Sequence, residues 1–465
     1  MIVKQLYTNC LAEAAYYIES DGEAAIIDPL RETAPYLEMI EENGSKLKYV
    51  FETHFHADFV SGHIDLAGKT GAQIVYGPEA TTSYDVVNAK DGEVFTLGKV
   101  TIKALHTPGH TLESTCYLLS DENGKQYALF SGDTLFVGDV GRPDLLDGFM
   151  TKEQLAGMMY DSLNNKIKPL ADDVILYPAH GPGSACGKNI GKETWSTIGT
   201  QKAMNYALQT MSREEFIEKV TAGLTPPPRY FFEDARINKQ GYDNIDTVLS
   251  NNNKALSVND FTDAMNTGAL VLDTRHQDNF EKGFIKGSIN IGLDGTFAVW
   301  VGTIVNINQP LILVTDAGKE QETILRLARV GYENVVGYLD GGIDSWIAAG
   351  NAVATVKSIE PDELAAHVGK EHEVVLDVRK IGEVEVGHVK GATNIALNDL
   401  TANLNLLDKS EGIYVHCAGG YRSMIAASIL QASGFESIIN VHGGWGKIKM
   451  TDIPMETGVP SNMIS

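Results

Sequence analysis

Residues 53–63 read THFHADFVSGH and place three histidines and one aspartate within eleven positions. The preceding run, residues 46–53, alternates and is rich in Val, Tyr and Phe, which predicts a β-strand that stops where the histidines begin. Strand ends are where rigid scaffolds present ligands. His54 and His56 can reach one point from a turning backbone, and imidazole with carboxylate suits zinc, iron or manganese. The stretch therefore predicts a metal site rather than surface histidines and a helix-capping Asp58.

Three later predicted strands end in the same way, and their turns read HTPGH, SGDT and PAHG. These turns supply the further candidate ligands His106, His110, Asp133 and His180. Between the strands lie helical patterns, so two sheets with helices outside them are expected. One first-row metal ion at the edge of the sheets accounts for four strand ends that share this pattern.

Together these motifs resemble the metallo-β-lactamase superfamily, whose fold is an αββα sandwich, and the expected domain spans residues 1–237. Hydrolases of that superfamily, such as glyoxalase II, bind two metals through an HxHxDH motif. Phe59 replaces the last histidine of that motif here, and Asp58 and His180 alone would remain for a second metal. A binuclear hydrolase is therefore the less favoured expectation.

The bulk properties restrict the partners and the compartment. A chain of 465 residues is longer than one hydrophobic core usually spans, so several domains are expected. A formal net charge of −24 disfavours nucleic acid and anionic membranes as partners. No apolar run approaches the length of a membrane span, and the N-terminus lacks a long apolar region, so a cytoplasmic protein is expected. Four cysteines without a CxxC pair exclude a disulfide framework.

An internal repeat fills the second half of the chain. LDTR at 272–275 recurs as LDVR at 376–379, and GFIKGSINI at 283–291 recurs as GHVKGATNI, 104 residues later in both cases. The repeat predicts two homologous α/β domains, at residues 255–353 and 354–465. The polar, Asn-rich segment 238–254 is predicted to be a linker.

The second repeat carries HCAGGYRS at residues 416–423, between a strand and a helical run. The backbone N–H groups between Cys417 and Arg422 can hold an anion at the positive end of the helix, which lowers a thiol pKa. The loop resembles that of rhodaneses, sulfurtransferases that carry a persulfide on this cysteine. Cysteine phosphatases place five residues between Cys and Arg, whereas four stand here. The first repeat has Asp316 in place of the cysteine, so we expect that domain to be catalytically silent.

The whole chain resembles bacterial persulfide dioxygenase/rhodanese fusion proteins of sulfide detoxification. That resemblance implies one Fe(II) per chain. Carried over by position, its ligands are His54, His110 and Asp133, and three positions stay open for substrate and O2. The groups expected to orient ligands or to donate to substrate are His56, Asp58 and His180.

The implied reaction oxidises a low-molecular-weight thiol persulfide with O2 to sulfite. Cys417 would then pass sulfane sulfur to sulfite and release thiosulfate. Glutathione, coenzyme A and bacillithiol remain possible thiols, and a homo-oligomer remains open. Two alternatives also stay open: a zinc thioester hydrolase of glyoxalase II type with rhodanese appendages, and a sulfur-carrier scaffold in which only Cys417 is modified.

Three residues keep two interpretations each. Cys186 lies in a small-residue loop past His180, where it either relays sulfur or gates substrate, or simply packs a tight turn. Arg142 and Arg229 either clamp a carboxylate or phosphate of the thiol carrier or form salt bridges that order their loops.

Overall fold

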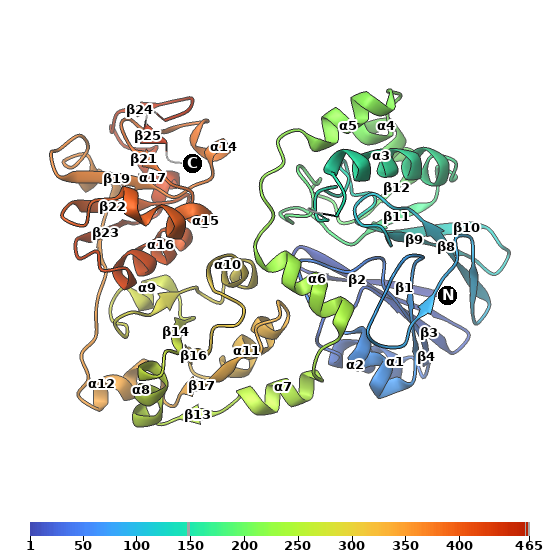
Figure 1. Ribbon diagram of the computed structural model, residues 1–465, viewed down its shortest axis with the longest axis horizontal. Coiled ribbons are helices and arrows are strands. Elements are labelled where there is room, and N and C mark those ends of the chain that lie inside the picture. Colours follow the sequence, from blue (N-terminus) through green and yellow to red (C-terminus); the bar gives the residue numbers. More distant parts are fainter. Residues whose placement is uncertain (147–148, 461, 464–465) are drawn as a thin grey trace. The chain divides into compact units, whose positions relative to one another are not determined.

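The computed structural model describes residues 1–146, 149–460 and 462–463. The chain divides into two compact units, Met1–Val248 with Ala328–Gly331, and Leu249–Leu327 with Tyr332–Ser465. Figure 1 shows the elements of both units. Each unit is described by itself.

The first unit contains two six-stranded sheets with the orders β1-β2-β3-β4-β5-β6 and β12-β11-β10-β9-β8-β7. The strands of the first sheet are β1 (Ile2–Thr8), β2 (Glu13–Ser20), β3 (Glu23–Ile27), β4 (Lys46–Phe51), β5 (Gln73–Tyr76) and β6 (Val87–Asn88). Those of the second are β7 (Val94–Leu97), β8 (Val100–His106), β9 (Thr115–Ser120), β10 (Gln126–Gly132), β11 (Ile175–Pro178) and β12 (Ser196–Thr197).

One apolar core joins the two sheets. It contains Tyr16 and Phe51 from the first sheet together with Tyr117 and Phe130 from the second, all fully buried. Because side chains alternate along a strand, the other faces of the same strands pack against helices. These helices are α1 (Ala34–Glu42), α2 (His63–Thr70), α3 (Lys152–Ser162), α4 (Ile198–Met204) and α5 (Arg213–Thr221), with a π-helical turn at Leu163–Ile167 and a 3₁₀ turn at Tyr206–Leu208. The expected αββα sandwich is confirmed.

Four strands of this sandwich end where the candidate ligands begin. β4 ends at Phe51, β8 at His106, β10 at Gly132 and β11 at Pro178. Gly132 adopts a φ of 52°, and a Cβ there would lie 2.5 Å from Thr53 Oγ1. The bend at this glycine therefore lets the end of β10 approach the end of β4 closely.

The segment predicted to be a linker, 238–254, is largely helical. It contains the end of α6 (Tyr230–Gln240) and all of α7 (Ile245–Asn252). Asn238 is buried and donates to the backbone oxygens of His56 and Phe59, at 2.8 Å each. Ile245 and Val248 are buried as well. The boundary between the units lies inside this segment, while the predicted domain bounds stay predictions.

The second unit contains two sheets whose strand pairs are all parallel, β13-β17-β16-β14-β15 and β18-β23-β22-β19-β21-β25, and a small antiparallel pair, β20-β24. The first repeat comprises β13 (Ala255–Leu256), α8 (Val258–Asn266), β14 (Leu270–Asp273), α9 (Gln277–Phe280), β15 (Ile289–Asn290), α10 (Phe297–Ile304), β16 (Leu311–Val314), α11 (Glu320–Ala328), β17 (Val335–Leu339) and α12 (Gly342–Ala348).

The second repeat has the same order of elements with β20, a 3₁₀ turn, β24 and β25 added. It comprises β18 (Lys357–Ile359), α13 (Pro361–Leu364), β19 (Glu373–Asp377), α14 (Ile381–Val384), β20 (His388–Val389), β21 (Thr393–Asn394), α15 (Leu397–Leu400), a 3₁₀ turn (Thr401–Leu406), β22 (Gly412–His416), α16 (Tyr421–Ala432), β23 (Ile438–Val441), α17 (Gly444–Ile448), β24 (Met455–Glu456) and β25 (Asn462–Met463). The predicted duplication is confirmed. Within the described residues, every helix is too short or too polar to span a bilayer.

Candidate active sites

His54 follows the end of β4 and is oriented by its neighbour Thr53. The Thr53 hydroxyl donates to Asp28 Oδ2 at 2.8 Å, so its oxygen accepts from His54 Nδ1–H at 2.9 Å. This contact assigns the proton of the neutral ring to Nδ1 and leaves the lone pair on Nε2. Burial lowers the pKa of His54 well below its ordinary value, and the neighbouring His56 lowers it further. The ring is therefore neutral with a free lone pair on Nε2, which is the form that binds metals.

His110, in the turn after β8, is oriented in the same way. Its Nδ1–H donates to the carbonyl oxygen of Arg142 at 2.8 Å, which again leaves Nε2 free. Asp133 Oδ2 lies 3.4 Å from His110 Nε2 and 3.8 Å from His54 Nε2. All three atoms are buried and lack a hydrogen-bond partner among the described residues, and they lie within 4.8 Å of one another. Three unpartnered donor atoms that converge in a dry site fit a metal ion.

His180 fixes the other oxygen of Asp133. Its Nδ1 lies 2.8 Å from Asp133 Oδ1 and its Nε2 2.8 Å from Asp58 Oδ2. Burial opposes the charged ring, but the two carboxylates together raise the pKa of His180 well above its ordinary value. Burial likewise opposes ionisation of Asp133, whereas the surrounding imidazoles hold its pKa well below the usual range. Asp133 therefore offers one oxygen, Oδ2, to the group with His54 and His110.

Cys186 joins Asp58 and His180 in a second buried group whose ligand atoms lie within 4.8 Å of one another. Burial, followed by the charges of Asp58 and Asp133, raises the pKa of the Cys186 thiol well above its usual value. Phe59, also fully buried, stands at the motif position where a binuclear hydrolase has a further histidine. The sequence placed Cys186 near the metal but did not predict this grouping, because the spacing from Asp58 is long.

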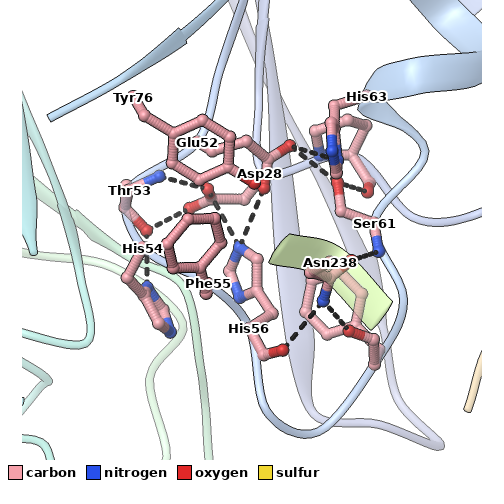
Figure 2. A network of polar contacts seen from close by, with 12 residues as sticks. Asp28, Glu52, Thr53, His54, Phe55, His56, Ser61, His63, Tyr76 and Asn238 are labelled. Atoms are coloured by element: carbon pink, nitrogen blue, oxygen red, sulfur yellow. Dashed lines mark hydrogen bonds and ion pairs between the residues drawn. The ribbon is translucent and has the colours of Figure 1, made fainter. Parts of the chain in front are cut away.

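His56 lies beside His54, with ring centroids 4.2 Å apart, but belongs to a third group. Figure 2 shows its Nε2 directed toward Asp28 and Glu52, at 3.0 Å and 3.5 Å. Both carboxylates are buried, and the sequence analysis did not single them out. A signal was present, since Glu52 is a charged residue directly after a strand of apolar character.

The other candidates lie outside these groups. Arg142 is buried, and its guanidinium contacts Asp144 at 2.6 Å and the backbone oxygens of Ala185 and Thr225. These contacts fit the interpretation that it orders its loop. Arg229 is exposed at the start of α6. His106 is half-buried, and its Nε2 contacts the backbone oxygen of Leu112 at 2.8 Å.

Cys417 follows β22 in the second repeat and is buried. The Gly420 N–H donates to its Sγ at 3.1 Å. Gly420 has a φ of 115° and α16 begins at the next residue, so the Gly420 N–H and the positive end of the helix lie beside the sulfur. This arrangement places a hydrogen-bond donor and a helix N-terminus where the sulfur chemistry of Cys417 would take place.

Arg422 does not point freely into the loop. Its two terminal nitrogens donate to the two oxygens of Glu383, at 2.7 Å each. This bidentate pair lowers the pKa of Glu383 and fixes a positive charge beside the Cys417 loop.

Comparisons with known proteins agree with this architecture. Residues 8–180 match the metallo-beta-lactamase superfamily, and residues 257–349 and 360–451 each match the rhodanese-like domain. The human mitochondrial persulfide dioxygenase ETHE1 is 32% identical over 231 residues, which covers 49% of this chain and 83% of that protein. A hydroxyacylglutathione hydrolase of Tolumonas auensis is 36% identical over 169 residues, covering 36% of this chain and 60% of that protein.

A solved structure extends the similarity into the second unit. A metallo-beta-lactamase from Staphylococcus aureus subsp. aureus COL aligns with a TM-score of 0.65 and 34% identity, and covers 72% of this chain and 98% of its own. The chain belongs to the metallo-beta-lactamase superfamily, among the fusions of a persulfide dioxygenase-like domain with tandem rhodanese-like domains.

Proposed function

We propose that the chain oxidises a low-molecular-weight thiol persulfide to sulfite in its first unit and converts sulfite to thiosulfate at Cys417. The observation that carries the proposal is the buried convergence of His54 Nε2, His110 Nε2 and Asp133 Oδ2. Two imidazoles and one carboxylate are the donor set of non-haem Fe(II) oxygenases. One iron per chain, held by these three residues, would activate O2 and bring it next to the persulfide.

The chain's own residues set up the first reaction. In balance, RSS⁻, O2 and H2O give RSH, sulfite and one proton. Thr53 and the Arg142 carbonyl hold the two imidazoles in the required tautomer. His180 and Asp58 form a buried ion pair beside Asp133, where a proton can be held during turnover.

The second reaction uses the Cys417 thiolate. It attacks the terminal sulfur of a persulfide, forms the Cys417 persulfide and releases RS⁻. Sulfite then takes that sulfur, which regenerates the thiolate and gives thiosulfate. The Gly420 N–H and the start of α16 stabilise the negative sulfur in both steps. Having both sites on one chain raises the effective concentration of sulfite at Cys417.

Three further assignments belong to this proposal. The thiol is a small anionic carrier such as glutathione, coenzyme A or bacillithiol, for which the exposed Arg229 is the candidate contact. Cys186, beside Asp58 and His180, gates the persulfide. The protein acts in the cytoplasm, where its free cysteines stay reduced.

Oxygen uptake tests the first reaction. Glutathione persulfide should drive O2 consumption and sulfite formation by the full-length, iron-loaded protein, and His110→Ala should abolish both. His106→Ala is the matched control, because His106 stands in the same HTPGH motif but its ring contacts the Leu112 backbone and is not a member of the candidate metal group. Turnover that is equal with and without O2, or equal in the two variants, overturns the proposal.

A second candidate is a thioester hydrolase with two metals. It is favoured by the group Asp58, His180 and Cys186 and by the similarity to hydroxyacylglutathione hydrolase. Against it, Phe59 stands in place of the last histidine of the HxHxDH motif, which leaves Asp58, His180 and Cys186 for a second metal. About two zinc ions per chain, with hydrolysis of S-lactoylglutathione, would favour the hydrolase; about one iron per chain favours the oxygenase.

A further inference from the structure

Glu52 and Asp28 form a buried carboxylate pair directly behind the candidate metal group. Figure 2 shows that both face the Nε2 atom of His56, which lies 3.0 Å from Asp28 Oδ1 and 3.5 Å from Glu52 Oε2. All three side chains are buried. Among the described residues, neither Glu52 Oε2 nor His56 Nε2 has a hydrogen-bond partner, so the contact between them is an ion-pair contact at 3.5 Å. Both carboxylates therefore attract the same ring nitrogen of His56, Nε2.

Both carboxylates are themselves fixed. Asp28 accepts from the Thr53 backbone N–H at 2.7 Å and from the Thr53 hydroxyl at 2.8 Å. Glu52 Oε1 contacts Ser61 Oγ at 2.6 Å and lies 3.5 Å from His63 Nδ1. These contacts come from the segment that joins β4 to α2 and from the start of α2, so neither carboxylate can follow His56 if that ring moves.

His56 would otherwise be well placed to bind the metal. Its ring lies beside His54, a proposed ligand, with centroids 4.2 Å apart. Its second nitrogen, Nδ1, is buried and has no hydrogen-bond partner in the described part of the chain, which is costly for a polar atom. Yet the ligand atom of His56 groups with Asp28 and Glu52, and not with His54, His110 and Asp133.

We infer that Glu52, together with Asp28, is a positioning residue that holds His56 out of the metal's coordination sphere. The inference rests on the proposed metal site at His54, His110 and Asp133. A third imidazole would fill one of the three positions needed for persulfide and O2, and it would favour tetrahedral zinc over iron. Glu52 is thus a determinant of how many ligands the protein supplies.

The number of coordinated imidazoles tests this directly. The full-length protein, loaded with Co(II) alone, should show two imidazoles by X-ray absorption spectroscopy. Glu52→Ala should show three, with one fewer exchangeable water. The double variant Glu52→Ala/His56→Ala should return to two, because His56 is the ligand that Glu52 excludes. A merely structural role of Glu52 would lower stability or metal content without raising the imidazole count.

Two outcomes overturn the inference: Glu52→Ala that binds Co(II) with two imidazoles, or a third imidazole that persists when His56 is removed. If Glu52→Ala does not fold, Glu52→Leu takes its place with the same expectations, because leucine fills a similar volume without a polar group that faces His56. Failure of the proposed function is distinguishable, since unsubstituted protein would then hold no Co(II), or hold it unchanged in His110→Ala.

Discussion

The two rhodanese-like repeats have the same scaffold and opposite active-site loops. In both repeats, an arginine two residues after a strand aspartate binds that aspartate with the same geometry. Arg275 contacts Asp273 at 2.6 and 3.0 Å, and Arg379 contacts Asp377 at 2.6 and 3.0 Å. All four side chains are buried, so these pairs support the fold rather than the chemistry.

The loops differ where sulfur chemistry would take place. In the first repeat, the Gly318 N–H donates to Glu320, and the first turn of α11 carries Glu320 and Glu322. In the second repeat, the Gly420 N–H donates to Cys417 Sγ, and the first turn of α16, all of it described, is free of acidic residues. The first loop is thus occupied by its own carboxylate, and the second is open to an anionic sulfur. Duplication preserved the scaffold, and the two loops differ in a few residues.

Exchanging the loop residues should give the largest effect. Cys417→Asp should lower sulfur transfer by roughly 10⁴-fold or more, as removal of a covalent nucleophile does in other enzymes. Asp316→Cys should not install transfer, because Glu320 and Glu322 repel an anionic sulfur there. Intact-mass measurement after incubation with thiosulfate should find persulfide at Cys417 of the unsubstituted chain and none on Cys417→Asp. Persulfide on the thiol that Asp316→Cys introduces would show that a cysteine by itself suffices.

The equivalent aspartates of the two repeats, Asp273 and Asp377, should contribute to stability with opposite pH dependences. Burial, followed by Asp316 among other causes, raises the pKa of Asp273, whereas His416 and Arg379 overcome burial and lower the pKa of Asp377. Stability from Asp377 is therefore present above its unfolded pKa of about 3.9 and is lost as pH falls through the lower folded value. For Asp273, stability is present below that pH and is lost as pH rises through the higher folded value.

Urea unfolding of Asp377→Asn and Asp273→Asn across this pH range checks the signs. Each substitution should cost about 3 kcal/mol or more, since it leaves a buried arginine without its partner. The penalty of Asp377→Asn should grow with rising pH, and that of Asp273→Asn should shrink. Penalties that change in the same direction would contradict the comparison.

Matched glycines behind the two loops should differ by a smaller amount. Gly444 and Gly342 both have positive φ, 52° and 59°. A Cβ on Gly444 would meet Cys417 O at 2.3 Å, whereas on Gly342 the nearest atom is Thr315 O at 3.3 Å. Gly342→Ala should cost about 1 kcal/mol of unfolding free energy, and Gly444→Ala about 2–3, because overpacking adds to the backbone strain. Only Gly444→Ala should also slow sulfur transfer; equal penalties would count against a tighter second loop.

The smallest effect is expected at Glu383. Its carboxylate is partly exposed, so its pair with Arg422 should contribute less than about 1 kcal/mol to stability. Glu383→Gln should lower the sulfur-transfer rate by less than about tenfold, because Arg422 keeps its charge but is less well fixed. Steady-state assays check this, and a loss as large as that of Cys417→Asp would make Glu383 part of the chemistry.

Local patterns predicted most of the fold. The strands that end at Phe51 and His106 alternate and are followed by Gly, Pro or His, and the 104-residue repeat is visible in the letters. Helix α7 was missed, because an Asn-rich run gives no sign that Ile245 and Val248 pack inward. The composition of a segment shows how polar it is, but tertiary contacts determine which of its residues are buried.

The site was predicted less completely. His54, His110 and Asp133 were chosen by resemblance, and the structure places their ligand atoms together. His56, Asp58 and His180 were expected to orient the ligands, but their grouping with Asp28, Glu52 and Cys186 was not predicted. Glu52 and the partners of Cys186 are brought in by strand pairing and loop packing, which spacing along one sequence does not reveal. Contacts between residues that are distant in sequence determine which histidines face the candidate group of His54, His110 and Asp133.

The ratio of thiosulfate formed to O2 consumed tests the central claim most directly. With glutathione persulfide, the unsubstituted protein should form about one thiosulfate for each O2 consumed, as the two balanced steps require. Cys417→Ser should consume O2 at the same rate but release sulfite in place of thiosulfate. Absence of O2 uptake, or thiosulfate that forms equally without Cys417, would contradict the account.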